Sequence, residues 1–191
     1  MDDIIRRFRV ASGGFAARLA DVQAGDWERA TPCTEWNVRQ LVNHVTRGNF
    51  NYAALVRGAG AADFLRMRDV DALGGDPAAA FERSADECAD AFDGVSDLML
   101  DYPLGRIRGA QALAVRTTDT VVHTWDLARA IGGDERLDPD LVAWIDAEFD
   151  VIYAGLAETP VSADTTHRFF KAPTGTAGPT AQKRLLYRMG R

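Results

Sequence analysis

Hydrophobic residues along this chain recur mostly at the three- and four-residue steps of an α-helix, and the long alternating patterns typical of β-strands are missing. We therefore expect an all-α fold. The pattern predicts long helices over Asp2–Val22 and Ala110–Ile131, and a short one over Thr180–Met189. Three further amphipathic segments begin near Asn37, Asp76-Pro77 and Asp138-Pro139.

Capping residues indicate where several of these helices begin and end. Asn37 is a good N-cap, and Gln40 stands three residues later, as in a capping box. Asp76-Pro77 and Asp138-Pro139 each combine an N-cap with proline at the first helical position. Gly132-Gly133 predicts the end of the helix that starts at Ala110.

The segments between the helices carry turn signals. Arg57–Gly75 is rich in glycine and alanine and predicts a loop with one helical turn. Val95–Gly109 looks irregular, with turns at Pro103 and Gly105. Together these elements predict an up-and-down four-helix bundle with an extra helix and a short C-terminal tail. We expect the bundle to span residues 1–158, and residues 159–191 to form a tail whose short helix packs on it.

Composition and charge exclude some classes of protein. The chain has 191 residues, of which 47% are hydrophobic and 26% are charged, as in one globular domain. With 22 basic and 28 acidic residues its net charge is −6, which argues against binding nucleic acid or an anionic membrane. No apolar run approaches the roughly 20 residues needed to span a bilayer.

The N-terminal residues and the cysteines favour a cytoplasmic protein. Acidic residues come first, and Arg6 and Arg7 break up the apolar stretch, so the start does not resemble a signal peptide. Cys33 and Cys88 are the only cysteines, and two thiols do not make a disulfide framework. We expect a reducing compartment.

Polar residues on an otherwise core-facing stripe point to chemistry. Asp119 and His123 lie four residues apart on one face of the Ala110–Ile131 helix, and His44 lies in the apolar stripe of the helix that follows Asn37. Two imidazoles and a carboxylate suit Zn²⁺, Fe²⁺, Ni²⁺ or Mn²⁺. Three protein ligands would leave a position for water or substrate, which is the pattern of a catalytic site.

Simpler interpretations of these residues remain open. His44 could be a hydrogen-bonded core histidine, and Asp119 with His123 could be a buried ion pair. Asp126, on the same stripe, could fix the orientation of a metal ligand or could instead contact Arg129. Arg129 is a second candidate for a residue that orients groups near the metal.

Other reactive or aromatic side chains have less distinctive surroundings. Cys33 could be a nucleophile, but no histidine is near it in sequence, and a small buried thiol before a helix is the simpler interpretation. His167 stands in a segment rich in threonine and aspartate, which is typical of a surface loop. We expect Trp36 and Trp125 to be core aromatics.

Two blocks of the sequence resemble a known family. Thr31–Val45, which reads TPCTEWNVRQLVNHV, and His123–Gly132, which reads HTWDLARAIG with Asp119 one turn before it, are similar to the metal-binding domain of mycothiol-dependent maleylpyruvate isomerase. The Pro-Leu-Gly turn at Pro103–Gly105 is similar too, and the resemblance runs from about Ala16 to Arg191.

The resemblance implies a DinB-like four-helix bundle that binds one divalent metal, often zinc. The family's ligand positions fall here on His44, Asp119 and His123. Related members use low-molecular-weight thiols, mycothiol or bacillithiol, in isomerase, S-transferase or detoxifying reactions. The architecture also permits a homodimer.

Two departures from the isomerase bear on the expected activity. The full isomerase carries an additional C-terminal domain that contributes to its active site, whereas this sequence ends at Arg191 after a short tail. Position 119 is Asp, where the isomerase has the longer Glu. We expect a metal- and thiol-dependent transferase or isomerase acting on a small electrophile. A non-catalytic metal-binding bundle or stress-response binding module, and a hydrolase that uses metal-bound water, stay open as alternatives.

Overall fold

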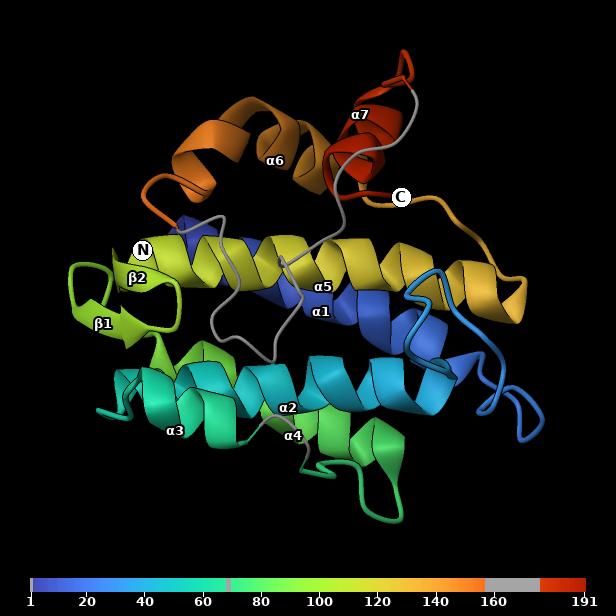
Figure 1. The fold of residues 1–191 in the computed structure, drawn as a ribbon, viewed down its shortest axis with the longest axis horizontal. Coiled ribbons are helices and arrows are strands. Elements are labelled where there is room, and N and C mark those ends of the chain that lie inside the picture. The colour runs from blue at the N-terminus through green and yellow to red at the C-terminus, as the bar shows by residue number, and fades with distance from the viewer. Residues whose placement is uncertain (1, 68–69, 157–175) are drawn as a thin grey trace.

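A computed structural model describes residues 2–67, 70–156 and 176–191. Its centre is a bundle of four long helices (Figure 1). In this bundle α5 lies between α1 and α2, and α4 closes the ring by contacting both α1 and α2. These helices are α1 (Asp2–Ala20), α2 (Val38–Val56), α4 (Pro77–Ala91) and α5 (Gly109–Ile131). The expected all-α, DinB-like bundle is confirmed.

Three shorter helices surround the bundle. The six-residue α3 (Ala61–Arg66) lies within the predicted loop Arg57–Gly75, which agrees with the single helical turn expected there. The helices α6 (Pro139–Ile152) and α7 (Ala181–Arg188) pack against each other on the outer side of α5 (Figure 1).

The predicted capping residues begin the helices they were expected to begin. The side chain of Asn37 accepts a hydrogen bond from the Gln40 backbone N–H, and the Gln40 side chain accepts one from the Asn37 N–H, which completes the capping box of α2. Asp76 and Asp138 accept hydrogen bonds from the first turns of α4 and α6. Gly132 adopts a left-handed conformation, with φ of 73°, and ends α5.

The hydrophobic pattern predicts no strands, and for the described part of the chain this prediction was wrong. A small antiparallel hairpin, β1 (Met99–Tyr102) and β2 (Gly105–Arg108), occupies the segment expected to be irregular. Leu100, Tyr102 and Ile107 point inward and are buried, while their neighbours are exposed. Alternation over only four residues in each strand is too short to stand out from a helical pattern.

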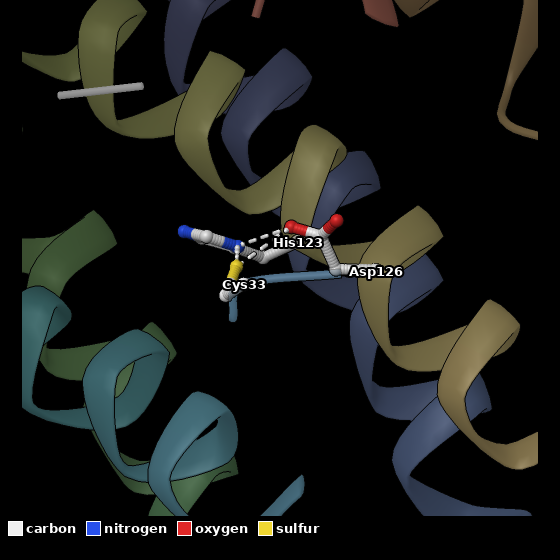
Figure 2. A group of neighbouring side chains, drawn as sticks. All are labelled: Cys33, His123 and Asp126. Carbon is white, nitrogen blue, oxygen red and sulfur yellow. Dashed lines mark hydrogen bonds and ion pairs between the residues drawn. The ribbon is translucent and has the colours of Figure 1, made fainter. Parts of the chain in front are cut away.

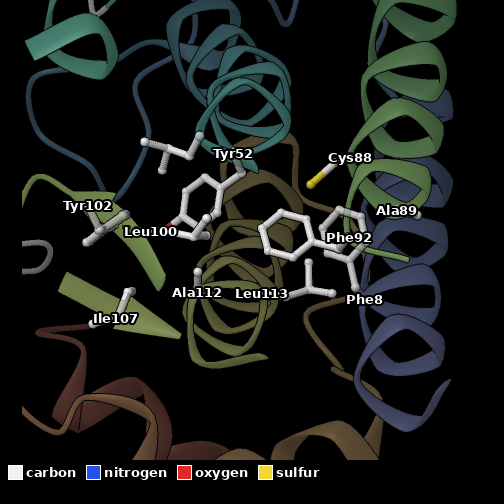
Figure 3. Close-up of a cluster of buried hydrophobic side chains, with 11 residues drawn as sticks. Phe8, Tyr52, Cys88, Ala89, Phe92, Leu100, Tyr102, Ile107, Ala112 and Leu113 are labelled. Atoms are coloured by element: carbon white, nitrogen blue, oxygen red, sulfur yellow. Dashed lines mark hydrogen bonds between the residues drawn. The ribbon is translucent and has the colours of Figure 1, made fainter. Parts of the chain in front are cut away.

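One hydrophobic cluster ties the hairpin to all four bundle helices (Figure 3). Phe8 of α1 and Phe92, just after α4, are fully buried in it. Tyr52 of α2 donates a hydrogen bond from its hydroxyl to that of Tyr102 in β1, at 2.9 Å, so the polar ends of both rings are satisfied. A second cluster joins α5 to α6 and α7. It includes Ile145 of α6 and Met189, the residue that follows α7.

Some sequence expectations fall outside the described residues. His167 and the boundary at residue 158 lie in the segment 157–175, so the division into bundle and tail stays a prediction. None of the helices in the described part of the chain is long and apolar enough to cross a membrane.

Substituting Phe8→Ala should lower the free energy of unfolding by about 3–5 kcal/mol, because it leaves a cavity where a fully buried ring belongs to the cluster shared by the bundle helices and the hairpin. Urea unfolding followed by circular dichroism measures this change. The matched control is Val10→Ala on the same helix, where the side chain is 40% exposed and the expected change is within about 0.5 kcal/mol. Equal losses in the two variants would contradict the assigned core.

Candidate metal centre

Helix α5 is buried on all sides from Ala112 to Ala128, whereas the sequence pattern indicates a single buried stripe. Its threonines can be buried because their hydroxyls donate hydrogen bonds to backbone carbonyls four residues earlier in the helix. The threonines that do so are Thr117, Thr118, Thr120 and Thr124. The ionisable residues of this helix therefore stand in surroundings with little access to water.

The structure brings His44 of α2 together with Asp119 and His123 of α5. Their potential ligand atoms all lie within 4.8 Å of one another. His44 Nε2 is 3.6 Å from Asp119 Oδ2, and His123 Nε2 is 3.3 Å from Asp119 Oδ1. Neighbouring donor atoms around a tetrahedral zinc with bonds of about 2.0–2.2 Å lie roughly 3.3–3.6 Å apart. Each histidine nitrogen therefore lies at about this spacing from one oxygen of Asp119, His44 from Oδ2 and His123 from Oδ1.

His44 Nε2 is one of several buried side-chain atoms in the described part of the chain that lack a hydrogen-bond partner, and among them it alone belongs to a candidate ligand group. It is buried and has no hydrogen-bond partner in the described part of the chain. Native proteins rarely bury a polar atom without a partner, and each such atom calls for an explanation such as an ion. A cation held with Asp119 and His123 would supply the missing partner.

Arg116 fixes one oxygen of Asp119. Its guanidinium, which is almost completely buried, donates to Asp119 Oδ2 at 2.6 Å, to Asn49 Oδ1 at 2.7 Å and to the Val45 carbonyl at 2.5 Å. Gly48 makes room for it, because a Cβ atom there would lie 2.5 Å from one guanidinium nitrogen. Asp119 Oδ1 is left facing His123, so the carboxylate can still offer an oxygen to a cation.

The charges around the site are strongly coupled. Burial alone would raise the pKa of Asp119, but His123, His44 and Arg116 hold it well below its usual range. Burial would lower the pKa of His123, yet the carboxylates of Asp119 and Asp126 raise it well above the usual value. Desolvation lowers the pKa of His44 to about 4, so this imidazole is neutral at pH 7 and keeps a lone pair for a metal.

The loop before α2 covers the site. The hydroxyl of Thr31 donates to the Trp36 carbonyl at 2.8 Å and accepts the Cys33 N–H at 3.1 Å, which holds the loop in a tight turn. The Trp36 ring stacks on His44 with 4.4 Å between centroids. Trp36 is thus a partly buried wall of the site, whereas Trp125 is buried as expected for a core aromatic.

A second group of side chains, Cys33, His123 and Asp126, shares His123 with the first (Figure 2). His123 Nδ1 is 2.9 Å from Asp126 Oδ2, and Cys33 Sγ is 3.3 Å from the same oxygen and 3.9 Å from Nδ1. Arg191 donates to both Asp126 oxygens, at 2.6 and 2.8 Å. Because both oxygens of Asp126 already accept hydrogen bonds, this group is less suited to a metal than the first.

Sequence reasoning found some of these neighbours and missed others. Asp126 contacts His123, as expected if it fixes the orientation of a metal ligand. The alternative prediction, that Asp126 contacts Arg129, was wrong. Arg129 pairs with Glu135 and lies over the Trp125 ring. The arginine that pairs with Asp126 is Arg191. The roles of Cys33 and Arg191 were missed because 93 and 65 residues separate them from Asp126.

Gly48→Ala should destabilise the protein by about 1–3 kcal/mol, because the new methyl group would displace the Arg116 guanidinium from its three acceptors. Thermal and urea unfolding measure the effect. Gly13→Ala in α1 is the matched control: a Cβ there meets nothing within 4 Å, and the substitution should stabilise by about 0.5–1 kcal/mol. A Gly48→Ala protein as stable as the wild type would show that Arg116 does not need this space.

Comparisons with known proteins agree with this architecture. Two uncharacterized proteins of Mycobacterium tuberculosis, MT0763 from strain CDC 1551 / Oshkosh and Rv0738 from strain ATCC 25618 / H37Rv, are each 36% identical over 143 residues, or 74% of this chain and 74% of theirs. The crystal structure of the mycothiol-dependent maleylpyruvate isomerase has the same fold, with a TM-score of 0.59 and 13% sequence identity, over 77% of this chain and 68% of that chain.

The resemblance noted in the sequence is also confirmed by a family model. The model described as the mycothiol maleylpyruvate isomerase N-terminal domain matches residues 8–128, which include the loop over the site, α2 and most of α5. The chain therefore belongs to the mycothiol maleylpyruvate isomerase N-terminal domain family.

Proposed function

We propose that this protein binds one divalent metal ion, zinc in preference to nickel, iron or manganese, through His44, Asp119 and His123. The observation that carries the proposal is the buried Nε2 of His44, which lacks a hydrogen-bond partner and faces a carboxylate and a second imidazole. Two nitrogen ligands and one oxygen ligand form a set that zinc accepts readily.

The proposed reaction is transfer or isomerisation that depends on a small thiol such as mycothiol. Membership of a family named for a mycothiol-dependent isomerase supports a thiol cosubstrate. A bound metal would supply Lewis acidity that converts a thiol to its more nucleophilic thiolate near neutral pH. Three protein ligands leave a coordination position for that thiol.

The burial of the ligands indicates the side from which a thiol would approach. The side chain of His44 is 26% exposed, whereas that of His123 is only 4% exposed. We therefore expect a thiol to approach from the side of His44, whose ring is stacked on Trp36. The apolar face of Trp36 could also line the path of a small electrophilic substrate.

The residues of this chain would have separate tasks in the reaction. Arg116 holds one oxygen of Asp119 and balances its charge, and Asp126 accepts the Nδ1 proton of His123. A thiolate, formed by loss of the thiol proton to solvent, would attack an electrophilic carbon of the substrate. In S-transfer the carbon–sulfur bond replaces the bond to a leaving group, which departs with its electron pair. In isomerisation the thiolate adds to a conjugated carbon–carbon double bond, the single bond so formed rotates, and expulsion of the thiolate restores the double bond.

Protein purified without chelators or a metal-capturing tag should contain close to one equivalent of divalent metal by elemental analysis. His44→Ala and His123→Ala should each lose most of it, because either change removes one of three ligands. His167→Ala replaces a histidine outside the proposed ligand set and is the matched control. Less than a tenth of an equivalent in the wild type after reconstitution with each metal would refute the metal centre.

The metal-loaded protein should consume electrophiles such as chlorodinitrobenzene only when mycothiol is present. Product analysis by mass spectrometry gives the rate, and the expected loss in His44→Ala is at least about 100-fold, as for removal of a main catalytic group. Turnover without added thiol would favour the metal-dependent hydrolase. Stoichiometric metal with no turnover against a broad panel would favour a non-catalytic binding protein.

A further inference from the structure

Arg191, three residues beyond the end of α7, reaches back into the core of the bundle. Its side chain is only 6% exposed, and that of its partner Asp126 is completely buried. Nε donates to Asp126 Oδ1 at 2.6 Å and one terminal nitrogen donates to Oδ2 at 2.8 Å. This two-pronged geometry is the strong, orientationally specific form of an arginine–carboxylate pair.

The position of Arg191 is set by apolar anchors and by its own backbone. Leu185 and Met189 pack into the cluster shared by α5 and α6, and the Arg191 N–H donates to the Leu186 carbonyl at 2.8 Å. The terminal nitrogen that contacts Asp126 also lies 3.0 Å from Cys33 Sγ. The guanidinium therefore joins α7, α5 and the loop over the site at one point.

This contact bears on the metal centre because Asp126 also contacts His123. With Arg191 holding both oxygens, Oδ2 is directed at His123 Nδ1, 2.9 Å away. In the neutral imidazole that metal binding requires, a proton on Nδ1 that is donated to this carboxylate leaves the lone pair on Nε2, the nitrogen that faces Asp119. Without the arginine, the buried carboxylate would keep the contacts of Oδ2 with Cys33 and His123 but would lose the cation that balances its charge and holds Oδ1.

We propose that Arg191 is a positioning residue of the metal centre, acting through Asp126 to fix the ring orientation and tautomer of His123. The proposal rests on the proposed function, since it needs a metal bound to His123. It makes the segment after α7 part of the site, although neither α7 nor Arg191 contributes a ligand.

The test is a double-mutant cycle on zinc affinity, measured by competition with a chromophoric chelator. Arg191→Gln and Asp126→Asn should each weaken zinc binding by about 10–100-fold, the usual effect of losing a group that orients a metal ligand. The double variant should bind no more weakly than Asp126→Asn alone, because the proposed effect of Arg191 on His123 passes through Asp126. Arg191→Lys, which retains the charge but not the two-pronged geometry, should show a smaller loss than Arg191→Gln.

The cobalt-loaded proteins provide a second readout that does not depend on activity. A changed visible absorption spectrum in Arg191→Gln would report a disturbed His123 ligand, whereas loss of global stability alone would leave the spectrum of the folded fraction unchanged. Arg184→Gln is the matched control, because in the described part of the chain Arg184 pairs with Asp146 to dock α7 on α6 and makes no hydrogen bond with Asp126. This control should bind zinc as the wild type does.

Several results would overturn the proposal. If Arg191→Gln binds zinc as tightly as the wild type, Arg191 has no positioning role, although the metal centre stands. The same conclusion follows if the fold losses in zinc affinity of the two single variants multiply in the double variant. If Arg191→Gln does not fold, the zinc affinity of Arg191→Lys is measured instead. A wild-type zinc affinity in that variant would show that the two-pronged contact with Asp126 is not needed. A wild-type protein that binds no zinc refutes the proposed function and this inference together.

Discussion

Four ionisable side chains of α5, those of Arg116, Asp119, His123 and Asp126, lie inside the bundle, where an uncompensated charge would cost several kcal/mol. Their compensation comes from other parts of the chain. Hydrogen-bond acceptors on α2 and the carboxylate of Asp119 satisfy Arg116, and Arg191 satisfies Asp126. The bundle can therefore close around these charges only if α2, α5 and the segment after α7 are held in register.

The cost of burying polar groups also explains why the unpartnered Nε2 of His44 indicates a bound cation. The hydrophobic clusters of the bundle provide most of the stability of the fold and need no charged groups. A protein under selection for stability alone gains little from charges at this depth, since apolar side chains of similar volume often stabilise as well or better. Retaining them together with an unpartnered His44 Nε2 is most simply explained by a bound cation.

Much of the fold could be predicted from the sequence because caps and helical periodicity act locally. Asn37 with Gln40, and Gly132, mark helix ends by interactions with their own neighbours. The β1–β2 hairpin could not be predicted, because its strands are short and its burial depends on Tyr52 and other distant residues. His44, Asp119 and His123 were identified because buried polar residues interrupt apolar stripes. Long-range partners leave no such local signal, and this is why Cys33 and Arg191 were missed.

Anomalous diffraction at the zinc absorption edge, from crystals of protein purified without chelators, tests the central claim most directly. The account predicts one strong peak about 2 Å from His44 Nε2, His123 Nε2 and an oxygen of Asp119. A metal found instead between Cys33 and Asp126 would contradict the assigned ligand set. The absence of any peak in zinc-soaked crystals, with Asp119 bound only by Arg116 and the two histidines, would show that these residues form a buried ion-pair network and not a metal centre.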